Sequence, residues 1–213
     1  MMKRVGGLLL AVVVVLFAEV CSAQTAQNIL ERVKKKYDSI KDAELKFSQH
    51  VRFEVSKLEQ NVSGTLVIKK ENKYRVETEG RTIVTDGVTV WSYSQGTNQV
   101  LIDRYKGDER AMTPENILAV APKDYYASIL GKEKVGGVET RVLKLVPKDE
   151  NSLVRTMKAW VDESTWLIRK VEIVDVNDKT TMYVVSDMKI NTGVPDSRFA
   201  YQIPDGVEAV DLR

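Results

Sequence analysis

Apolar and polar residues alternate over much of this 213-residue chain, and this period of two is the feature that most constrains its fold. Alternation is typical of strands with one face buried and the other face in water. The clearest segments are residues 43–55, 62–68, 74–78, 88–93, 140–147, 157–162, 166–175 and 180–190. Short turns such as Asp86-Gly87 separate them, and short turns join antiparallel neighbours. About ten such strands predict a mainly β (α+β) fold with one large antiparallel sheet that must curl.

Three segments depart from this alternation and predict helices. Residues 26–40 place apolar side chains at helical spacing. Thr113-Pro114 is typical of a helix start, so we expect a helix over residues 114–120 and, after Pro122, a second one over residues 123–130. The large apolar side chains of this pair are Ile117, Leu118, Tyr125, Tyr126, Ile129 and Leu130. Three helices are too few to cover the apolar face of such a sheet, which predicts a surface for an apolar ligand or partner.

The first 23 residues are predicted to be a cleavable secretory signal peptide. A basic pair at residues 3–4 precedes an apolar run over residues 8–18, and small residues precede the expected cut between Ala23 and Gln24. An uncleaved N-terminal anchor is the alternative, but the run is short for a membrane span. We therefore expect residues 24–213 to form one exported domain.

The lone cysteine, Cys21, permits a second interpretation of the N-terminus. In bacterial lipoproteins a cysteine after the apolar run becomes acylated. The charged Glu19 close to Cys21 disfavours this, and Cys21 fits the small residue three positions before the cut. Without Cys21 the exported part has no disulfides and depends on its core for stability.

Composition and residue types argue against several classes of function. The 32 basic and 30 acidic residues are interspersed, so we expect neither a nucleic-acid surface nor a polybasic membrane anchor. His50 is the single histidine, and it lies out of register with the apolar positions around it. We find no metal-binding spacing and no phosphate loop. We therefore expect no enzyme activity, metal or cofactor, with a hydrolase that depends on His50 as a distant alternative.

Two stretches of the chain resemble a known family. The first includes Gly64-Thr65-Leu66, Ile68-Lys69-Lys70 and Tyr74-Arg75-Val76, and it ends in the hairpin from Ile83 to Tyr93. Its most specific part is Thr85-Asp86-Gly87 followed by Trp91 and Tyr93. The second stretch, from Phe199 to Val207, is similar to the closing pattern of the same family. In both, the chain resembles the outer-membrane lipoprotein carriers, the LolA family.

The resemblance implies a curved half-barrel of about eleven antiparallel strands, with an N-terminal helix and lid helices over an apolar cavity. It implies a periplasmic carrier in a Gram-negative cell that works without chemistry or cofactor. Such a carrier takes acylated lipoproteins from an inner-membrane lipoprotein-releasing ABC exporter and passes them to an outer-membrane lipoprotein receptor. We expect a monomer that binds no nucleic acid.

The resemblance also assigns roles to Lys70 and Tyr74. The family has a basic residue and an aromatic residue at these two positions, and both are tied to lid opening and cargo transfer. Where the family more often has Arg-Pro, this chain has Lys70-Glu71. Because lysine lacks the planar fork of arginine, we expect a weaker clamp on the lid.

Four further residues are candidates for the cavity wall. Met182 and Met188 alternate in one predicted strand, and their adaptable side chains suit an apolar lining or, alternatively, an ordinary core. Trp91 and Tyr93 share one face of another strand and are expected either to line the cavity or to form a cross-strand aromatic cluster.

Two further functions remain as alternatives to the carrier. One is a lipid-anchored outer-membrane receptor of similar fold, which needs an acylated Cys21. The other is a lipid-sensing regulatory module, which usually has a second domain.

Overall fold

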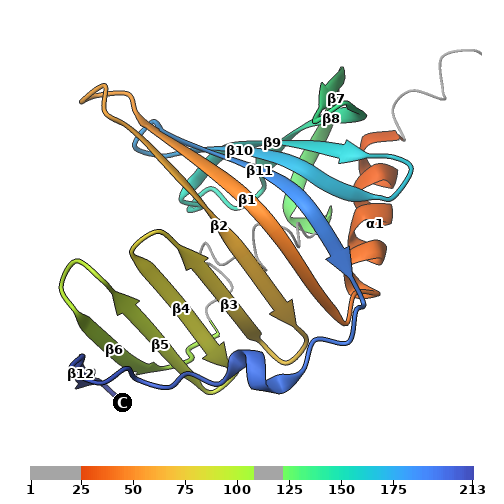
Figure 1. Cartoon of the computed structure of the whole chain (residues 1–213). Coiled ribbons are helices and arrows are strands. Elements are labelled where there is room, and N and C mark those ends of the chain that lie inside the picture. Colours follow the sequence, from red (N-terminus) through yellow and green to blue (C-terminus); the bar gives the residue numbers. More distant parts are fainter. Residues whose placement is uncertain (1–24, 108–121) are drawn as a thin grey trace, which may run out of the picture.

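The computed structural model describes residues 25–107 and 122–213. Within these ranges twelve strands form one open, curved sheet (Figure 1). The elements in chain order are α1 (Thr25–Asp38), β1 (Asp42–Phe53), β2 (Glu59–Lys69), β3 (Lys73–Thr78), β4 (Arg81–Asp86), β5 (Thr89–Ser94), β6 (Gln99–Arg104), the 3-10 helix η1 (Pro122–Asp124), β7 (Tyr125–Val135), β8 (Val138–Pro147), β9 (Val154–Asp162), β10 (Leu167–Asp175), β11 (Lys179–Ile190), the 3-10 helix η2 (Asp196–Phe199) and β12 (Glu208–Asp211).

The sheet consists of two antiparallel meanders joined side by side. Strands β1–β6 follow one another in the first and β7–β11 in the second, and β1 pairs with β11 to join them. The final strand β12 adds to β6 in parallel, at the edge of the sheet. The predicted half-barrel is thus confirmed, with twelve described strands in place of about eleven and with one parallel pair.

Helix α1 covers the concave face of the second meander. Leu30 and Val33 are fully buried there and form the main core with side chains of β8–β10. Tyr37 packs against the same core, and its hydroxyl oxygen accepts a hydrogen bond from the backbone N–H of Ile168 at 3.2 Å. Burial raises the pKa of Tyr37 to about 12. The helix therefore buries its apolar face at one end of the half-barrel, as the periodicity of residues 26–40 predicted.

The predicted helix over residues 123–130 is wrong, because this segment begins the edge strand β7. Its side chains alternate between half-buried and exposed along the strand, and β8 pairs with it over its whole length. Gly131 directly follows the predicted helix and is typical of a helix end, but here it interrupts the β7–β8 register at a φ of 143°. Pairing with β8 outweighs the local helical pattern, as tertiary context often does. The other predicted helix, residues 114–120, lies outside the described residues.

The alternating residues Phe199, Tyr201 and Ile203 predict a short strand, and this prediction is also wrong. Phe199 ends η2 and is buried against Val67 and Val194, and residues 200–203 belong to no strand. Pro204, which lacks a backbone N–H, follows directly, so pairing resumes only in β12. The C-terminal segment thus crosses β2–β5 on the face opposite the groove described below (Figure 1).

Gly64 in β2 allows a close approach between β2 and β3. The ladder with β1 is regular through this position, so Gly64 forms no bulge there. A Cβ atom at Gly64 would lie 2.2 Å from the carbonyl oxygen of Glu77 and 2.9 Å from Cγ2 of Thr78. Only a residue without a side chain fits this contact.

We expect Gly64→Ala to lower the free energy of unfolding by about 1–3 kcal/mol, because the added methyl group overlaps a neighbouring backbone atom. Urea denaturation followed by circular dichroism measures the change. The control is Gly96→Ala, since a Cβ at Gly96 has no heavy atom within 4 Å and should leave stability unchanged. Equal stability of the two variants would contradict this account of Gly64.

Candidate functional site

An open groove of about 580 Å³ lies on the concave face of the sheet, beside the core that α1 covers. Most of its lining is apolar and comes from β1–β4, β10 and β11. The lining residues are Leu45, Phe47, Gln49, Val62, Leu66, Val76, Thr78, Glu79, Arg81, Ile83, Val171, Tyr183 and Val185.

Strand alternation and register bring these side chains together. Every second residue of β1 faces the groove, and Leu45 is paired with Leu66 of β2. Val76 of β3 is in turn paired with Ile83 of β4. Leu45 and Leu66 are buried and form the floor, whereas Val76 and Ile83 are half-buried and form a wall. The groove is therefore the uncovered continuation of the apolar face that α1 covers over the second meander.

Polar groups in the groove are few and are either paired or near its mouth. Gln49 is the one polar residue in the groove-facing register of β1, and its amide nitrogen donates a hydrogen bond to the hydroxyl of Tyr183 at 2.9 Å. Burial raises the pKa of Tyr183, so this hydroxyl is neutral at physiological pH. Glu79 and Arg81 are exposed at the β3–β4 turn. Such a surface can hold a flexible apolar chain through dispersion and dehydration, with no covalent step.

Tyr74 lies at the inner end of the groove. It is buried with the groove residues Leu45, Leu66 and Val185, and its ring meets that of Tyr105 edge to face with 6.5 Å between the centroids. The sequence singled out Tyr74 through the family resemblance, and the structure places it on the groove face of β3, packed with the floor residues Leu45 and Leu66.

Lys70 lies at the turn between β2 and β3, near the end of helix α1. Its Nζ donates a hydrogen bond to the backbone carbonyl oxygen of Asp38 at 3.1 Å. Asp38 is the last residue of α1, and a cation is favourable at a helix C-terminus. The contact ties the turn to α1, the helix that covers the core beside the groove. The predicted action of Lys70 on lid helices stays a prediction.

Trp91 and Tyr93 lie on the face of the sheet opposite the groove. Ile83 lines the groove and is paired with Ser92, so the residues on either side of Ser92 point to the other face. There Trp91 stacks on Tyr201 of the C-terminal segment, with 6.4 Å between ring centroids and 28° between ring planes. Trp91 therefore packs in an aromatic contact and is absent from the groove lining, as is Tyr93.

Met182 and Met188 do not share a face, although the sequence predicted one register for both. The β1–β11 ladder is interrupted around Asp187, whose φ is 50°. Met182 is paired with His50, next to the groove residue Tyr183, so it points away from the groove. Met188 packs with the cluster that includes Leu45, behind the groove floor. The bulge at Asp187 changes the phase of the alternation, which a strict period of two cannot predict.

The residues expected on the lid fall into three groups. Tyr125 and Ile129 pack against the core under α1, whereas Tyr126 and Leu130 are exposed on the other face of the edge strand β7. Ile117 and Leu118 lie outside the described residues. The groove walls that the structure shows are instead ordinary strand residues such as Phe47, Val62 and Val76, which nothing in the sequence distinguishes from a covered core.

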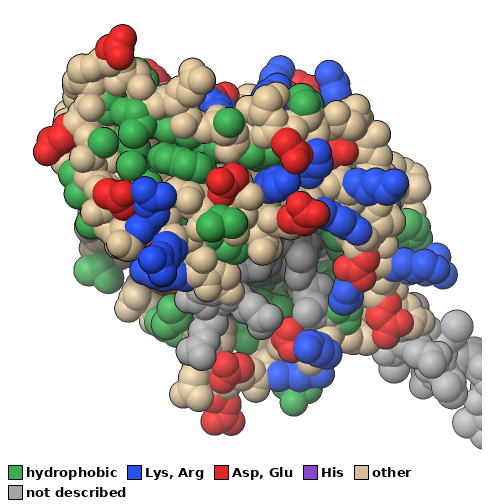
Figure 2. All heavy atoms as spheres, turned by 90° about the horizontal axis from the view of Figure 1, so that it is seen from below, with side chains coloured by type: hydrophobic (Ala, Val, Ile, Leu, Met, Phe, Trp, Pro, Cys, Tyr) green, Lys and Arg blue, Asp and Glu red, His purple; other side chains and the backbone are tan. Residues whose placement is uncertain are grey.

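Charged side chains of both signs surround these apolar surfaces. Figure 2 shows one face of the molecule, on which basic and acidic side chains are interspersed and hydrophobic side chains gather toward one side. In the part of the chain that the structure describes, no cluster of three or more His, Cys, Asp or Glu residues is placed to hold a metal ion. Within the same ranges, no helix is long and apolar enough to cross a membrane.

With an open apolar groove in a half-barrel, the protein falls in the class of curved-sheet proteins that can hold an apolar ligand without covalent chemistry. The family model of the outer membrane lipoprotein carrier protein LolA matches residues 38–202. The chain belongs to this family.

Two curated relatives are similar to this chain over most of its length. The chain is 27% identical to an uncharacterized protein of Methanocaldococcus jannaschii over 94% of its own length and 58% of that protein. It thus spans little more than half of that relative. It is 26% identical to the outer-membrane lipoprotein carrier protein of Glaesserella parasuis, over 90% of this chain and 87% of that one.

Two solved structures show the fold. An uncharacterized conserved protein of Thermus thermophilus matches with a TM-score of 0.56 at 16% identity, over 87% of this chain and 98% of that chain. The lipoprotein LppX of Mycobacterium tuberculosis matches with a TM-score of 0.52 at 10% identity, over 79% of this chain and 96% of that chain.

Proposed function

We propose that the protein is a periplasmic chaperone that shelters the acyl chains of lipoproteins in its groove. The observation that carries this proposal is the open apolar groove beside α1 in a chain of the LolA family. Its volume of about 580 Å³ lies in the range of small-ligand sites, and its walls are half-buried aliphatic and aromatic side chains.

Physical chemistry explains why an acyl cargo needs such a site. Each acyl methylene exposed to water costs about 0.8 kcal/mol, so three chains of roughly 15 carbons cost more than about 30 kcal/mol in the periplasm. A carrier must also release its cargo. A groove without ionic anchors for the chain suits both demands, because it binds through many weak contacts that break one after another.

The proposal includes a route for the cargo. We propose that lipoproteins arrive from an inner-membrane lipoprotein-releasing ABC exporter and leave to an outer-membrane receptor. Export through a signal peptide over residues 1–23 would place the protein between the two membranes. The Glaesserella parasuis relative is named an outer-membrane lipoprotein carrier protein, which supports lipoproteins as the cargo.

The test is release of acylated lipoproteins from spheroplasts. The protein, purified after expression of the whole chain in a Gram-negative host, is expected to bring lipoproteins into the soluble fraction in proportion to its concentration. Buffer alone and an unrelated periplasmic protein are the controls. The carrier proposal is contradicted if the protein releases no lipoprotein and also binds no apolar dye.

A second candidate is a lipid-anchored receptor of the same fold. The position of Cys21 after the apolar run favours it, and the fold is shared with the lipoprotein LppX. The mass of the mature N-terminus separates the two candidates. A chain that begins at Gln24 supports the carrier, and a diacylglyceryl group on Cys21 supports the receptor.

A further inference from the structure

The hairpin of β1 and β2 exposes two aliphatic side chains at its tip. The strands end at Phe53 and begin again at Glu59, and residues 54–58 form the turn between them. Val55 is 92% exposed and Leu58 is 61% exposed. Figure 1 shows this hairpin projecting beyond the neighbouring strands. The transfer of such side chains from water into an apolar phase is favourable.

One face of the hairpin continues the groove toward this tip. The β1–β2 ladder is regular, so Val51 and Phe53 share the face of the groove residues Leu45 and Phe47. The backbone N–H of Phe53 donates to the carbonyl oxygen of Leu58 at 2.9 Å, which sets Leu58 opposite Phe53. An apolar track therefore runs along this face from the groove floor to the exposed tip, interrupted by Gln49 of β1 and Gln60 of β2.

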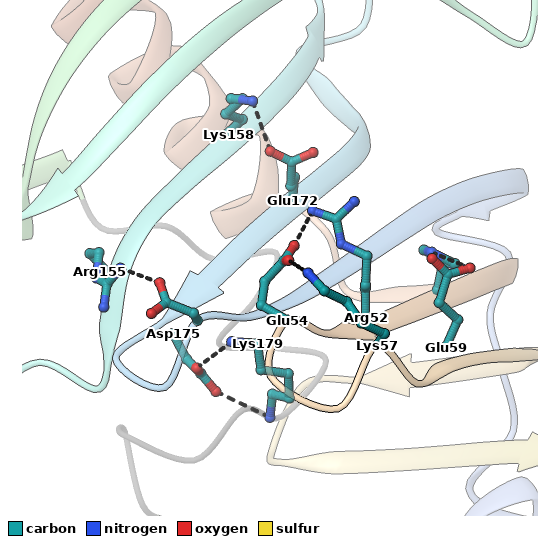
Figure 3. A network of polar contacts seen from close by, with 11 residues as sticks. Arg52, Glu54, Lys57, Glu59, Arg155, Lys158, Glu172, Asp175 and Lys179 are labelled. Atoms are coloured by element: carbon teal, nitrogen blue, oxygen red, sulfur yellow. Dashed lines mark hydrogen bonds and ion pairs between the residues drawn. The ribbon is translucent and has the colours of Figure 1, made fainter.

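The other face of the hairpin is charged. Glu54 forms ion pairs with Arg52 and with Lys57, the latter at 3.1 Å (Figure 3). Farther along this face, the Nδ1 of His50 and the side-chain oxygen of Asn61 share a hydrogen bond at 2.7 Å. The hairpin is thus an amphipathic ribbon, with aliphatic groups at its end and ion-paired charged side chains of both signs beside them. Basic side chains of this length keep their charged ends in water while their stems cover apolar surface.

We propose that the tip of this hairpin, residues 54–58, inserts into the interface of a lipid bilayer, and that the apolar track guides an acyl chain between the bilayer and the groove. The inference rests on the proposed function and adds to the exporter and the receptor a direct contact with the bilayer, across which an acyl chain can pass. A bilayer interface accepts a small amphipathic element whose apolar tip is flanked by charged side chains that stay in water. A stable protein partner would need about 800 Å² of this surface, which two side chains on a narrow tip do not offer.

Binding to vesicles is the first test. The double variant Val55→Asp, Leu58→Asp is compared with the unchanged protein on vesicles of phosphatidylcholine that contain a minority of phosphatidylglycerol. Charged groups at the tip should weaken binding by about tenfold or more, because they cannot enter the apolar layer. The control is Val88→Asp, Leu212→Asp, which alters side chains that are 72% and 58% exposed away from the hairpin. Circular dichroism confirms that all three proteins are folded.

Transfer kinetics distinguish this inference from the proposed function. A fluorescent acylated peptide is offered either in vesicles or free in dilute solution. The tip variant should take up the free peptide with unchanged affinity but should extract it from vesicles about tenfold more slowly. Extraction at the unchanged rate overturns the role of the hairpin and leaves the carrier proposal standing. Failure of the unchanged protein to bind the free peptide overturns both.

A protein partner at the tip gives a different result. The unchanged protein would then ignore protein-free vesicles, while the tip variant would still be impaired in releasing lipoproteins from spheroplasts. That result overturns the insertion of the tip into a bilayer and indicates that Val55 and Leu58 belong to a protein interface.

Discussion

Replacing Val62 with aspartate is expected to weaken the binding of an acyl chain by about 100-fold, or about 3 kcal/mol, while the protein stays folded. Val62 is a half-buried wall residue of the groove, so a carboxylate there meets water as long as the groove is empty. An acyl chain that fills the groove must remove this water, and a carboxylate without a partner in an apolar site is unfavourable. Fluorescence titration with an acylated peptide measures the loss.

The matched control is the neighbouring residue on the same strand. Ser63 is exposed and points to the opposite face of β2, so Ser63→Asp adds the same charge at almost the same height of the sheet without entering the groove. Its affinity for the acylated peptide should equal that of the unchanged protein. If Val62→Asp and Ser63→Asp bind equally well, the groove between β1 and β4 does not hold the cargo.

The fold of this chain was largely predictable because its strands obey a period of two. Residues 43–53 alternate with Gln49 as the one polar exception in the apolar register, and β1 covers them in the structure. The turn Asp86-Gly87 joins β4 to β5 as the sequence predicted, because Gly87 adopts a φ of 95° at a point where a Cβ would meet the carbonyl oxygen of Glu71 at 2.3 Å. Local chemistry decided these elements, so local patterns could predict them.

Residues 123–130 show where local patterns fail. The segment has apolar side chains at helical as well as strand spacing, and Gly131 resembles a helix end. What decides the outcome is the partner strand β8, which supplies a ladder that a single segment cannot reveal. The same limit applies to residues 199–203, whose place is set by packing against Val67 on a distant strand.

The position of the groove depends on long-range pairing in the same way. Strand β1 lies beside β11 although more than 100 residues separate them in the chain, and this pairing brings Tyr183 opposite Gln49. The sequence predicted an excess of apolar surface, but it could not tell which strands α1 leaves uncovered. Its candidates were therefore conspicuous residues such as Trp91 and Met182, which point to the other face, while plain aliphatic residues such as Val76 line the groove.

The turn between β9 and β10 secures the core on which the groove depends. The carboxylate of Asp162 is 2% exposed, and one oxygen accepts hydrogen bonds from the backbone N–H and the hydroxyl of Ser164 at 3.0 and 2.6 Å. The other oxygen accepts from the guanidinium of Arg169, whose Nη2 lies at 2.8 Å. The backbone carbonyl oxygen of Asp162 accepts from the N–H of Trp166, a residue that packs against α1. The buried Asp162 side chain thus stabilises the turn that places Trp166 against the core under α1.

We expect Asp162→Ala to lower the free energy of unfolding by about 2–4 kcal/mol, because it leaves the Arg169 guanidinium and the Ser164 N–H without their buried acceptor. Urea denaturation at neutral pH measures the effect. The control, Asp211→Ala, removes the carboxylate of an exposed ion pair with Arg213 and should leave stability unchanged. Equal stability of the two variants would show that the Asp162 contacts do not support the fold.

The same carboxylate makes a specific contribution to acid sensitivity. Burial alone would raise the pKa of Asp162, but the hydrogen bonds from Ser164 and Arg169 outweigh it and hold the pKa well below its ordinary value. The unfolded chain therefore binds a proton at this group at a pH where the folded protein does not. The stabilisation is complete above the ordinary aspartate pKa of about 3.9 and is lost as the pH falls from there toward the lower folded value.

Between neutral pH and about pH 3, the unfolding free energy of the unchanged protein should therefore fall more steeply than that of Asp162→Ala, so the two curves converge. Parallel curves over that range would mean that Asp162 keeps an ordinary pKa in the folded protein.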